Sequence, residues 1–221
     1  MDRVGIWTVR TGEGGGSRVS AATVAEPVEV DAADLVVAEE AMAERKQSAL
    51  FMVREGEGAL DRLLADRGYA KSPEVAILVA GTDALATPAP DPMTAILTAP
   101  RLARATETWA EGGLSAGRMA VMDRVTVPKM HLIARHDDRP SGAAFVAVDE
   151  SVAMMHALEI HPDKRRAGLG RVMTARAAEW AGSVGAETLA LQVERPNVAA
   201  MALYASLGMT EVCGYHYRIK T

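Results

Sequence analysis

The sequence predicts an α+β protein in which a mixed central β-sheet is flanked by helices. Short apolar runs alternate with longer amphipathic stretches along the 221 residues, and these two periodicities are typical of strands and helices. Glycines at 68, 185 and 208 follow the predicted helices, where a C-terminal cap requires them. With 49% hydrophobic and 24% charged residues, the composition is typical of a globular chain.

Composition and charge narrow the classes of function. A formal net charge of −5 argues against broad binding to nucleic acid or to a membrane surface. Cys213 is the single cysteine, which excludes an internal disulfide and argues against a cysteine-based metal site. The N-terminus lacks the apolar run of a signal peptide, and no stretch approaches the ~20 apolar residues that span a bilayer. We therefore expect a cytoplasmic protein with no metal, nucleic acid or membrane as partner.

A proline-rich segment divides the chain. Between residues 82 and 92, three prolines stand at alternating positions, which favours an extended conformation and opposes a helix. We place a domain boundary near residue 91. The prediction is an N-terminal α/β half over residues 1–91 and a second domain over residues 92–221.

The predicted elements follow from local periodicity and from turn residues. In the first half they are two strands within 5–24, a helix over 31–47, a strand over 50–54, a helix over 59–67 and a buried strand over 75–80. No helix is expected after the glycines at 12–16, which are interpreted as a flexible hairpin turn. In the second half they are helices over 93–111 and 114–124, strands over 130–135, 143–148 and 152–161, a helix over 170–184, a strand over 189–193, a helix over 198–207 and a strand over 215–219.

A faint internal repeat links the two halves. Shifting the chain by 140 residues lays Phe51–Tyr69 on Leu191–Met209 without a gap. Both stretches are predicted as strand, turn, helix, glycine and strand. Two ordinary strand–helix units that look alike are an equal alternative.

The most informative motif is Arg165-x-x-Gly168-x-Gly170, which lies between a predicted strand and a predicted helix. The first turn of a helix has free N–H groups and a partial positive charge, which suit a pyrophosphate. Glycines allow the backbone to approach phosphate oxygens, and Arg166 and Arg171 add positive charge. The motif differs from a P-loop, which requires Gly-Lys-Ser/Thr, and from a dinucleotide fingerprint, which requires a third glycine.

This motif resembles the signature of the GNAT superfamily of N-acetyltransferases. A second part of the resemblance lies downstream, where Asn197 precedes Ala-x-x-Leu-Tyr-x-x-x-Gly at residues 200–208. The resemblance covers residues 130–221 well and residues 93–129 more loosely. It implies the GNAT fold, preceded by a smaller half that is GNAT-like but has no such motif and has lost its cofactor site.

The resemblance also implies a cofactor, acetyl-CoA, with CoA as the product. Backbone groups of residues 158–160 would pair with the pantetheine arm, and N–H groups of residues 166–171 would hold the pyrophosphate. The strands that end at Ile160 and Val193 would separate to admit the thioester. The implied cofactor-binding residues are Leu158, Glu159, Ile160, Arg165, Arg166, Ala167, Gly168, Leu169, Gly170, Arg171, Asn197 and Tyr204.

Tyr204 is the candidate acid, because GNAT members commonly carry a tyrosine near the CoA sulfur and the departing thiolate benefits from a proton. A packed aromatic whose hydroxyl reaches the surface is the structural alternative. Cys213 lies far in sequence from any base. It is interpreted as a small buried apolar residue, and a covalent acetyl-cysteine route is disfavoured.

Two residues are candidates for the proton acceptor. An imidazole has a suitable ordinary pKa near neutrality, and His156 aligns with the second of two strand histidines in some GNAT members, although Met154 replaces the first. Glu159 is the rival, and strand alternation places it on the opposite face from His156 unless a bulge intervenes. Gln192 stands where some protein N-terminal acetyltransferases have a catalytic glutamate, so that mechanism is absent. A water chain remains an alternative.

The predicted function is transfer of an acetyl group from acetyl-CoA to a primary amine by direct attack in a ternary complex. The alternative is a non-catalytic acyl-CoA-binding sensor or regulatory module. A small-molecule amine or a short peptide is the favoured acceptor, since the acidic balance suits a cationic amine. A homodimer is compatible with the sequence.

Overall fold

The computed structural model describes residues 1–220 and divides into two compact units. The first contains Met1–Ala76, Glu194–Pro196 and the C-terminal residues from Cys213. The second contains Ile77–Val193 and Asn197–Val212. The chain therefore leaves the first unit near residue 76, ahead of the boundary that the prolines suggest, and it returns there at its C-terminal end. None of the helices within residues 1–220 has the length and apolar content needed to cross a membrane.

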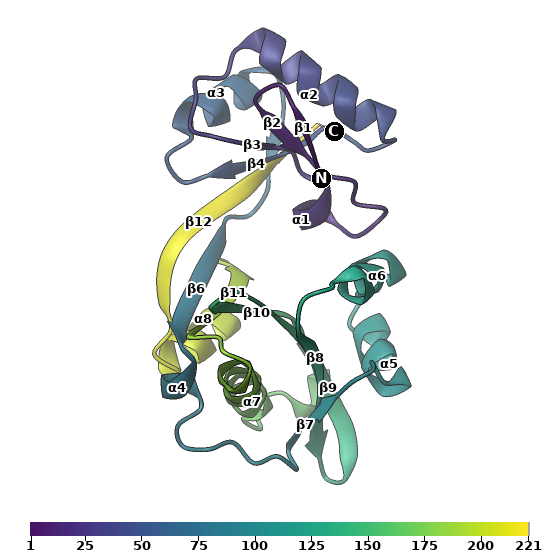
Figure 1. Cartoon of the computed structure of the whole chain (residues 1–221), viewed down its shortest axis with the longest axis vertical. Coiled ribbons are helices and arrows are strands. Elements are labelled where there is room, and N and C mark those ends of the chain that lie inside the picture. Colours follow the sequence, from purple (N-terminus) through teal and green to yellow (C-terminus); the bar gives the residue numbers. More distant parts are fainter. Residues whose placement is uncertain (221) are drawn as a thin grey trace. The chain divides into compact units, whose positions relative to one another are not determined.

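The second unit is a mixed sheet with helices on both faces (Figure 1). Its strand order is β12-β6-β11-β10-β9-β8-β7. The strands are β6 (Val75–Gly81), β7 (Ala95–Thr98), β8 (Lys129–His136), β9 (Arg139–Asp149), β10 (Val152–Ile160), β11 (Thr188–Glu194) and β12 (Thr210–Ile219). The helices are α4 (Thr82–Leu85), α5 (Ala103–Glu111), α6 (Ala116–Arg124), α7 (Leu169–Ser183) and α8 (Val198–Ser206). The predicted mixed sheet flanked by helices is confirmed.

Strand pairing in the second unit determines where the sheet opens. Strands β7 to β10 pair antiparallel in chain order, whereas β10 and β11 pair in parallel. A parallel pair needs a crossover connection, and α7 supplies it. Strand β6 lies between β11 and β12, so a strand from the N-terminal half of the sequence completes this sheet.

Helices α5 and α6 cover one face of β8 and β9 with a buried apolar cluster. Trp109, Met119 and Met122 pack there against Phe145 and Ala143. Helix α7 contacts β7 to β10 from the other face (Figure 1).

The first unit contains a small antiparallel sheet and two longer helices. Its strands are β1 (Asp2–Val4), β2 (Trp7–Val9), β3 (Thr23–Val24), β4 (Leu50–Arg54) and β5 (Ala70–Lys71), and its helices are α1 (Ser17–Ser20), α2 (Ala32–Glu44) and α3 (Gly58–Asp66). The sheet order is β1-β2-β3, and the C-terminal part of β12 pairs with β4 and β5. Its core is centred on Trp7, Phe51, Met42 and Leu64.

Two sequence predictions are wrong. Residues 93–111 do not form one helix, because they contain β7, a turn and then α5. Pro100 stands between them and cannot donate a backbone hydrogen bond inside a helix. The glycines at 12–16 are not a simple hairpin turn, because the helix α1 follows them directly. In addition, the short α4 forms just ahead of the prolines in the segment 82–92.

The internal repeat is supported by the element bounds. A shift of 140 residues carries Gly58–Asp66 onto Val198–Ser206, so α3 and α8 coincide residue for residue. Each helix is followed by a glycine with positive φ, 79° at Gly68 and 77° at Gly208. This conformation ends a helix, and glycine adopts it without a steric penalty.

Candidate active site

A cleft of about 600 Å³ lies within the second unit, where the end of β10, the loop before α7, and α8 meet. This volume is in the range of small-molecule and cofactor sites. It is lined by Leu158, Glu159, Ile160, Lys164, Arg165, Arg166, Gly168, Leu169, Gly170, Arg171, Asn197, Ala199, Ala200, Ala202, Leu203 and Tyr204. The structure thus brings together the sequence-predicted residues, except that Ala167 and His156 are not among the lining residues.

The loop before α7 presents an open helix N-terminus to this cleft. After the turn η1 (Pro162–Lys164), Arg166 and Gly168 adopt positive φ angles of 69° and 78°. Among the described residues no side chain caps α7, and the first turn of this helix carries no acidic residue. Within residues 1–220, no backbone carbonyl accepts the N–H groups of residues 166–170. Free N–H groups at the positive end of a helix suit an anion such as a diphosphate.

The two glycines of the motif have different roles. Gly168 needs its positive φ, and a Cβ added there would meet nothing within 4 Å. A Cβ at Gly170 would lie 2.9 Å from Leu203 Cδ2, so Gly170 permits close packing of α7 on α8. Both glycines line the cleft, as the sequence interpretation expects of residues that approach a phosphate.

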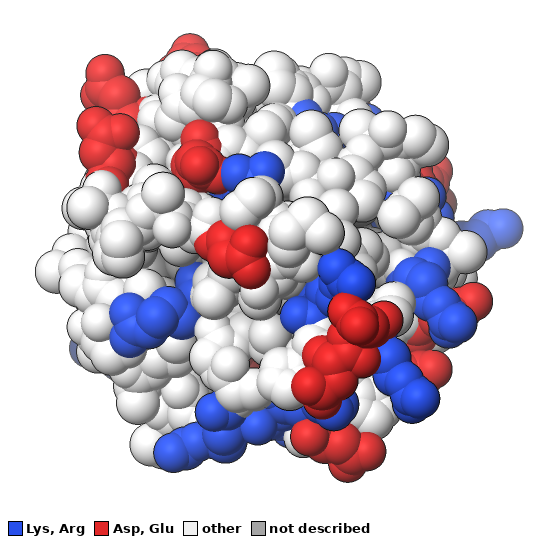
Figure 2. Space-filling model, turned by 90° about the horizontal axis from the view of Figure 1, so that it is seen from below, with Lys and Arg blue, Asp and Glu red and all other residues white. Residues whose placement is uncertain are grey.

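Basic side chains flank the loop but are tied to neighbours. Arg165 donates to Glu159 Oε1 and to the Ile160 carbonyl, each at 3.2 Å. Arg171 donates to Ser206 Oγ at 2.7 Å. Figure 2 shows acidic and basic side chains interspersed on the face that it presents.

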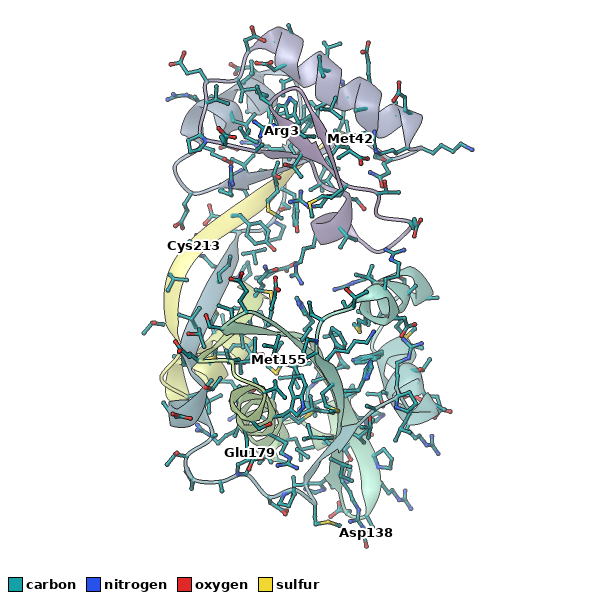
Figure 3. The ribbon with its side chains drawn as sticks, in the orientation of Figure 1. Arg3, Met42, Asp138, Met155, Glu179 and Cys213 are labelled. Atoms are coloured by element: carbon teal, nitrogen blue, oxygen red, sulfur yellow. The ribbon has the colours of Figure 1, made fainter. Side chains whose placement is uncertain are left out.

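Strands β10 and β11 separate where the cleft begins. Their parallel pairing runs from Val152 and Thr188 to Met155 and Leu191 and extends no further among the described residues. Met155 is buried in the second unit, where Figure 3 labels it. Beyond it, β10 has no partner strand on one edge within residues 1–220, as the resemblance implies for a slot.

A β-bulge follows at once on β10. The register with β9 slips between His156 and Glu159, and Ala157 has a φ of +50°. His156 stands opposite Phe145 and Glu159 stands opposite Ala143. Because those two β9 residues share a face, the bulge brings both candidate proton acceptors to one face of the sheet. Simple alternation, which would separate them, does not apply here.

That face is the one covered by α5 and α6, since Ala143 and Phe145 belong to the cluster beneath these helices. The rings of His156 and Phe145 are stacked with centroids 6.3 Å apart. The Glu159 side chain is 28% exposed and is paired with Arg165.

Tyr204 is almost entirely buried, with 7% exposure, and lies on the side of α8 that lines the cleft. Burial raises the pKa of Tyr204 to about 12. The hydroxyl is therefore protonated at neutral pH and can act as a proton donor.

Asn197 begins α8 and caps it, because its Oδ1 accepts the Ala200 N–H at 3.1 Å. The cap leaves the Nδ2 group as the donor that a ligand in the cleft could use. Small residues on the next turn, Ala199 and Ala202, also line the cleft and were not predicted. The signal that could have found them is helical spacing around Leu203 and Tyr204.

Two further residues lie outside the sequence prediction. Lys164 lines the cleft and is paired with Asp137 at 2.9 Å. Trp109 donates its indole N–H to the carbonyl of Ala157 at the bulge.

Cys213 is exposed, which corrects its interpretation as a buried apolar residue. Figure 3 labels this residue on β12.

Comparison with known sequences identifies the region around this cleft. Residues 101–209 match the model of the acetyltransferase (GNAT) family. An uncharacterized N-acetyltransferase, YobR, from Bacillus subtilis is 33% identical over 75 residues, which are 34% of this chain and 30% of that protein. The [ribosomal protein bS18]-alanine N-acetyltransferase of Salmonella typhimurium is 37% identical over 75 residues, 34% of this chain and 51% of that enzyme. The chain thus spans about half or less of these curated relatives.

The fold has a counterpart among solved structures. A GCN5-related N-acetyltransferase from Kribbella flavida superimposes with a TM-score of 0.69 at 21% identity, covering 92% of this chain and 82% of that one. At this identity the likeness concerns the fold, and it confirms the predicted GNAT architecture. The sequence match and the fold agree, and residues 101–209 of this chain belong to the acetyltransferase (GNAT) family.

Proposed function

We propose that this chain is an acetyl-CoA-dependent N-acetyltransferase that acetylates a primary amine in a ternary complex. One observation carries the proposal: the uncapped N-terminus of α7 opens into the same cleft as the buried hydroxyl-bearing side chain of Tyr204. Anion binding and proton donation are two of the properties that this reaction needs within one site.

The residues of the cleft fit the cofactor. N–H groups of residues 166–170 are available for a diphosphate, and Arg171 lies beside them. The open edge of β10 at residues 158–160 and the Asn197 Nδ2 group can hydrogen-bond an amide-containing arm. When bound, acetyl-CoA supplies the acetyl group as an activated thioester.

Tyr204 is assigned the role of acid. Burial raises the pKa of Tyr204 to about 12, so the hydroxyl carries its proton at neutral pH and can donate it to an adjacent thiolate. The low exposure of Tyr204 limits competition from water for this proton.

Glu159 and His156 are the candidates for accepting the amine proton. The bulge brings both to the face beneath α5 and α6. Glu159 also lines the cleft, whereas His156 stacks on Phe145. We assign the acceptor role to Glu159 first, because a carboxylate at the cleft can both hold a cationic amine and take its proton.

The acceptor is proposed to be a small-molecule amine or a short peptide. The Salmonella relative acts, by its name, on an alanine of a ribosomal protein. Gln192 stands at the position where the resemblance implies a catalytic glutamate for protein N-termini, which argues for a different acceptor or a different base in this chain.

Gln192 at the position of that glutamate favours one alternative function, a non-catalytic acyl-CoA-binding protein. A protein that holds acyl-CoA without turnover would need the loop of α7 but no base. In that case binding would be retained and no amine would be acetylated.

For the N-terminal half, residues 1–91, we propose a GNAT-like unit that has lost its cofactor site. The element order supports this: apart from α1, which lies between β2 and β3, the elements β1-β2-β3, α2, β4 and α3 repeat the order of β8-β9-β10, α7, β11 and α8. The C-terminal domain, residues 92–221, would then carry the chemistry.

The function is tested by a CoA-release screen against pooled amines, amino acids and peptides. Tyr204→Phe and Gly168→Glu serve as controls, each checked for folding by circular dichroism. Turnover that both substitutions suppress supports the enzyme. CoA binding without turnover across all pools supports the sensor, and the absence of CoA binding contradicts both.

A further inference from the structure

The bulge on β10 has a specific partner on α5. Trp109 is 1% exposed, and its Nε1–H donates to the Ala157 carbonyl at 2.7 Å. The two residues are 48 positions apart in sequence, so this bond is part of the tertiary fold. A buried indole N–H requires an acceptor, and a bulge carbonyl that is not used by a neighbouring strand can provide it.

Ala157 has a conformation that an alanine seldom adopts. Its φ of +50° lies in the left-handed region, which is unfavourable for a residue with a Cβ. Such a conformation persists only where the surrounding structure holds it. The hydrogen bond from Trp109 fixes the carbonyl of this residue.

The bulge determines on which face of the sheet Glu159 stands. It is the extra residue between His156 and Glu159 that brings the two side chains to one face. Three residues after Trp109, Gly112 makes room for the carboxylate, because a Cβ there would lie 2.7 Å from Glu159 Cγ. Helix α5 therefore both holds the bulge and accommodates the side chain that the bulge directs.

We propose that Trp109 is a positioning residue for acetyl transfer, which holds the bulge at Ala157 through its indole N–H and so orients Glu159. This role rests on the acetyltransferase function proposed above. It assigns to Trp109 no contact with substrate or cofactor.

The test compares Trp109→Phe with a matched control, Trp7→Phe. Trp7 is 0% exposed and donates its indole N–H to the Asp34 carbonyl at 2.8 Å, so both substitutions remove the same kind of bond from a buried ring. Trp109→Phe is expected to lower kcat by roughly 10-fold or more, since small misplacements of reacting groups are costly. The KM for acetyl-CoA should rise by a smaller factor than kcat falls, because the α7 loop is untouched and only the arm contact at residues 158–160 lies next to the bulge. Trp7→Phe should alter neither constant.

A second substitution separates positioning from packing. Glycine adopts φ near +50° without penalty, so Ala157→Gly in the Trp109→Phe background should restore kcat to within about 3-fold of the unmutated protein. A lost ring contact would not be repaired in this way. Equal effects of Trp109→Phe and Trp7→Phe on kcat, or no rescue by Ala157→Gly, would overturn the proposal.

Amide hydrogen exchange gives a readout that does not depend on turnover. Trp109→Phe should speed exchange at residues 157–159 and leave it unchanged in Trp7→Phe. If the unmutated protein acetylates no amine, this difference still supports the held bulge while the enzymatic function fails. If Trp109→Phe does not fold, slow exchange of the Trp109 indole proton in the unmutated protein supports the bond, and rapid exchange overturns it.

Discussion

The N-termini of α2 and α7 occupy comparable positions in the chain, but they differ in whether a side chain accepts their free N–H groups. Each helix follows the third strand of an antiparallel run, β3 in one unit and β10 in the other. At α2, Asp31 accepts the N–H groups of Ala33 and Asp34 at 2.7 and 2.9 Å, and Asp34 completes the capping box. At α7, Gly168 provides no such acceptor. One helix end is satisfied by its own carboxylates, whereas the other remains available to an external anion.

The regions where the strands next to these helices separate differ in the same way: one is filled by side chains of its own unit and the other is open. A single parallel bridge joins Ala22 to Phe51 in the first unit, as Met155 joins Leu191 in the second. Beyond the bridge, Arg54 donates to the Val24 carbonyl at 2.9 Å and pairs with the Glu57 carboxylate. An internal ion pair thus occupies the region of the first unit that corresponds to the open slot of the second. The comparison teaches that a similar order of elements can leave one helix end and strand gap satisfied internally and the other open.

Making α7 resemble α2 should have the largest effect. Gly168→Glu places a carboxylate at the helix end and a Cβ at a φ of 78°. We expect the Kd for CoA, measured by isothermal titration calorimetry, to rise by roughly 100-fold or more, because an internal anion competes with the diphosphate. Unchanged affinity in a folded variant would show that the two helix ends do not differ in the proposed way.

Tyr204 and its counterpart Leu64 provide the next test, since a shift of 140 residues superimposes them. Tyr204→Phe keeps the ring but removes the proton, so kcat should fall by about 100-fold while the Kd for CoA stays within about 2-fold. Tyr69→Phe is the control, because it removes a buried-ring hydroxyl that is bonded to Glu39 in the first unit. Equal kcat values for both variants would contradict the role of Tyr204 as the acid.

The proton acceptor is tested by Glu159→Gln against His156→Gln. If Glu159 takes the amine proton, its substitution should lower kcat/KM by ~10- to 100-fold. His156→Gln should change kcat/KM by less than about 3-fold. The reverse pattern would transfer the role to His156.

A smaller effect is expected at Asp61, whose counterpart on α8 is the uncharged Met201. The hydrogen bond from Arg218, opposed by burial and reinforced by His216, lowers the pKa of Asp61 to about 2. A carboxyl group whose pKa is lowered by folding stabilises the folded state at pH values above its ordinary pKa near 4. This contribution is lost as the pH falls from about 4 to about 2. At pH 7, Asp61→Asn should lower Tm by ~2–4 °C.

Differential scanning calorimetry from pH 7 to pH 2 checks this expectation. The Tm difference between Asp61→Asn and the unmutated protein should shrink below pH 4. A difference that stays constant over this range would contradict a stabilising charge at Asp61.

Local sequence patterns were sufficient to predict much of the fold and the loop before α7. The bounds of β4, α8 and the residues of the Arg-x-x-Gly-x-Gly motif follow from periodicity, glycine caps and a short-range motif. They could be predicted because the interactions that determine them lie within one or two turns of the chain.

Features that depend on distant partners could not be predicted. The bulge at Ala157 depends on β9 and on Trp109, and neither is visible in the alternation of β10. The strand β7 was hidden in an alanine-rich stretch, because its apolar residues suit either period until β8 pairs with it. The return of residues from Cys213 to the first unit depends on pairing with β4, more than 150 positions away.

The most direct measurement is a crystal structure of the protein with bound CoA. The account predicts diphosphate oxygens within hydrogen-bond distance of backbone N–H groups between Arg166 and Arg171, with no anion at the capped N-terminus of α2. A diphosphate bound elsewhere, or a loop at 166–171 that makes no contact with it, would contradict the central claim.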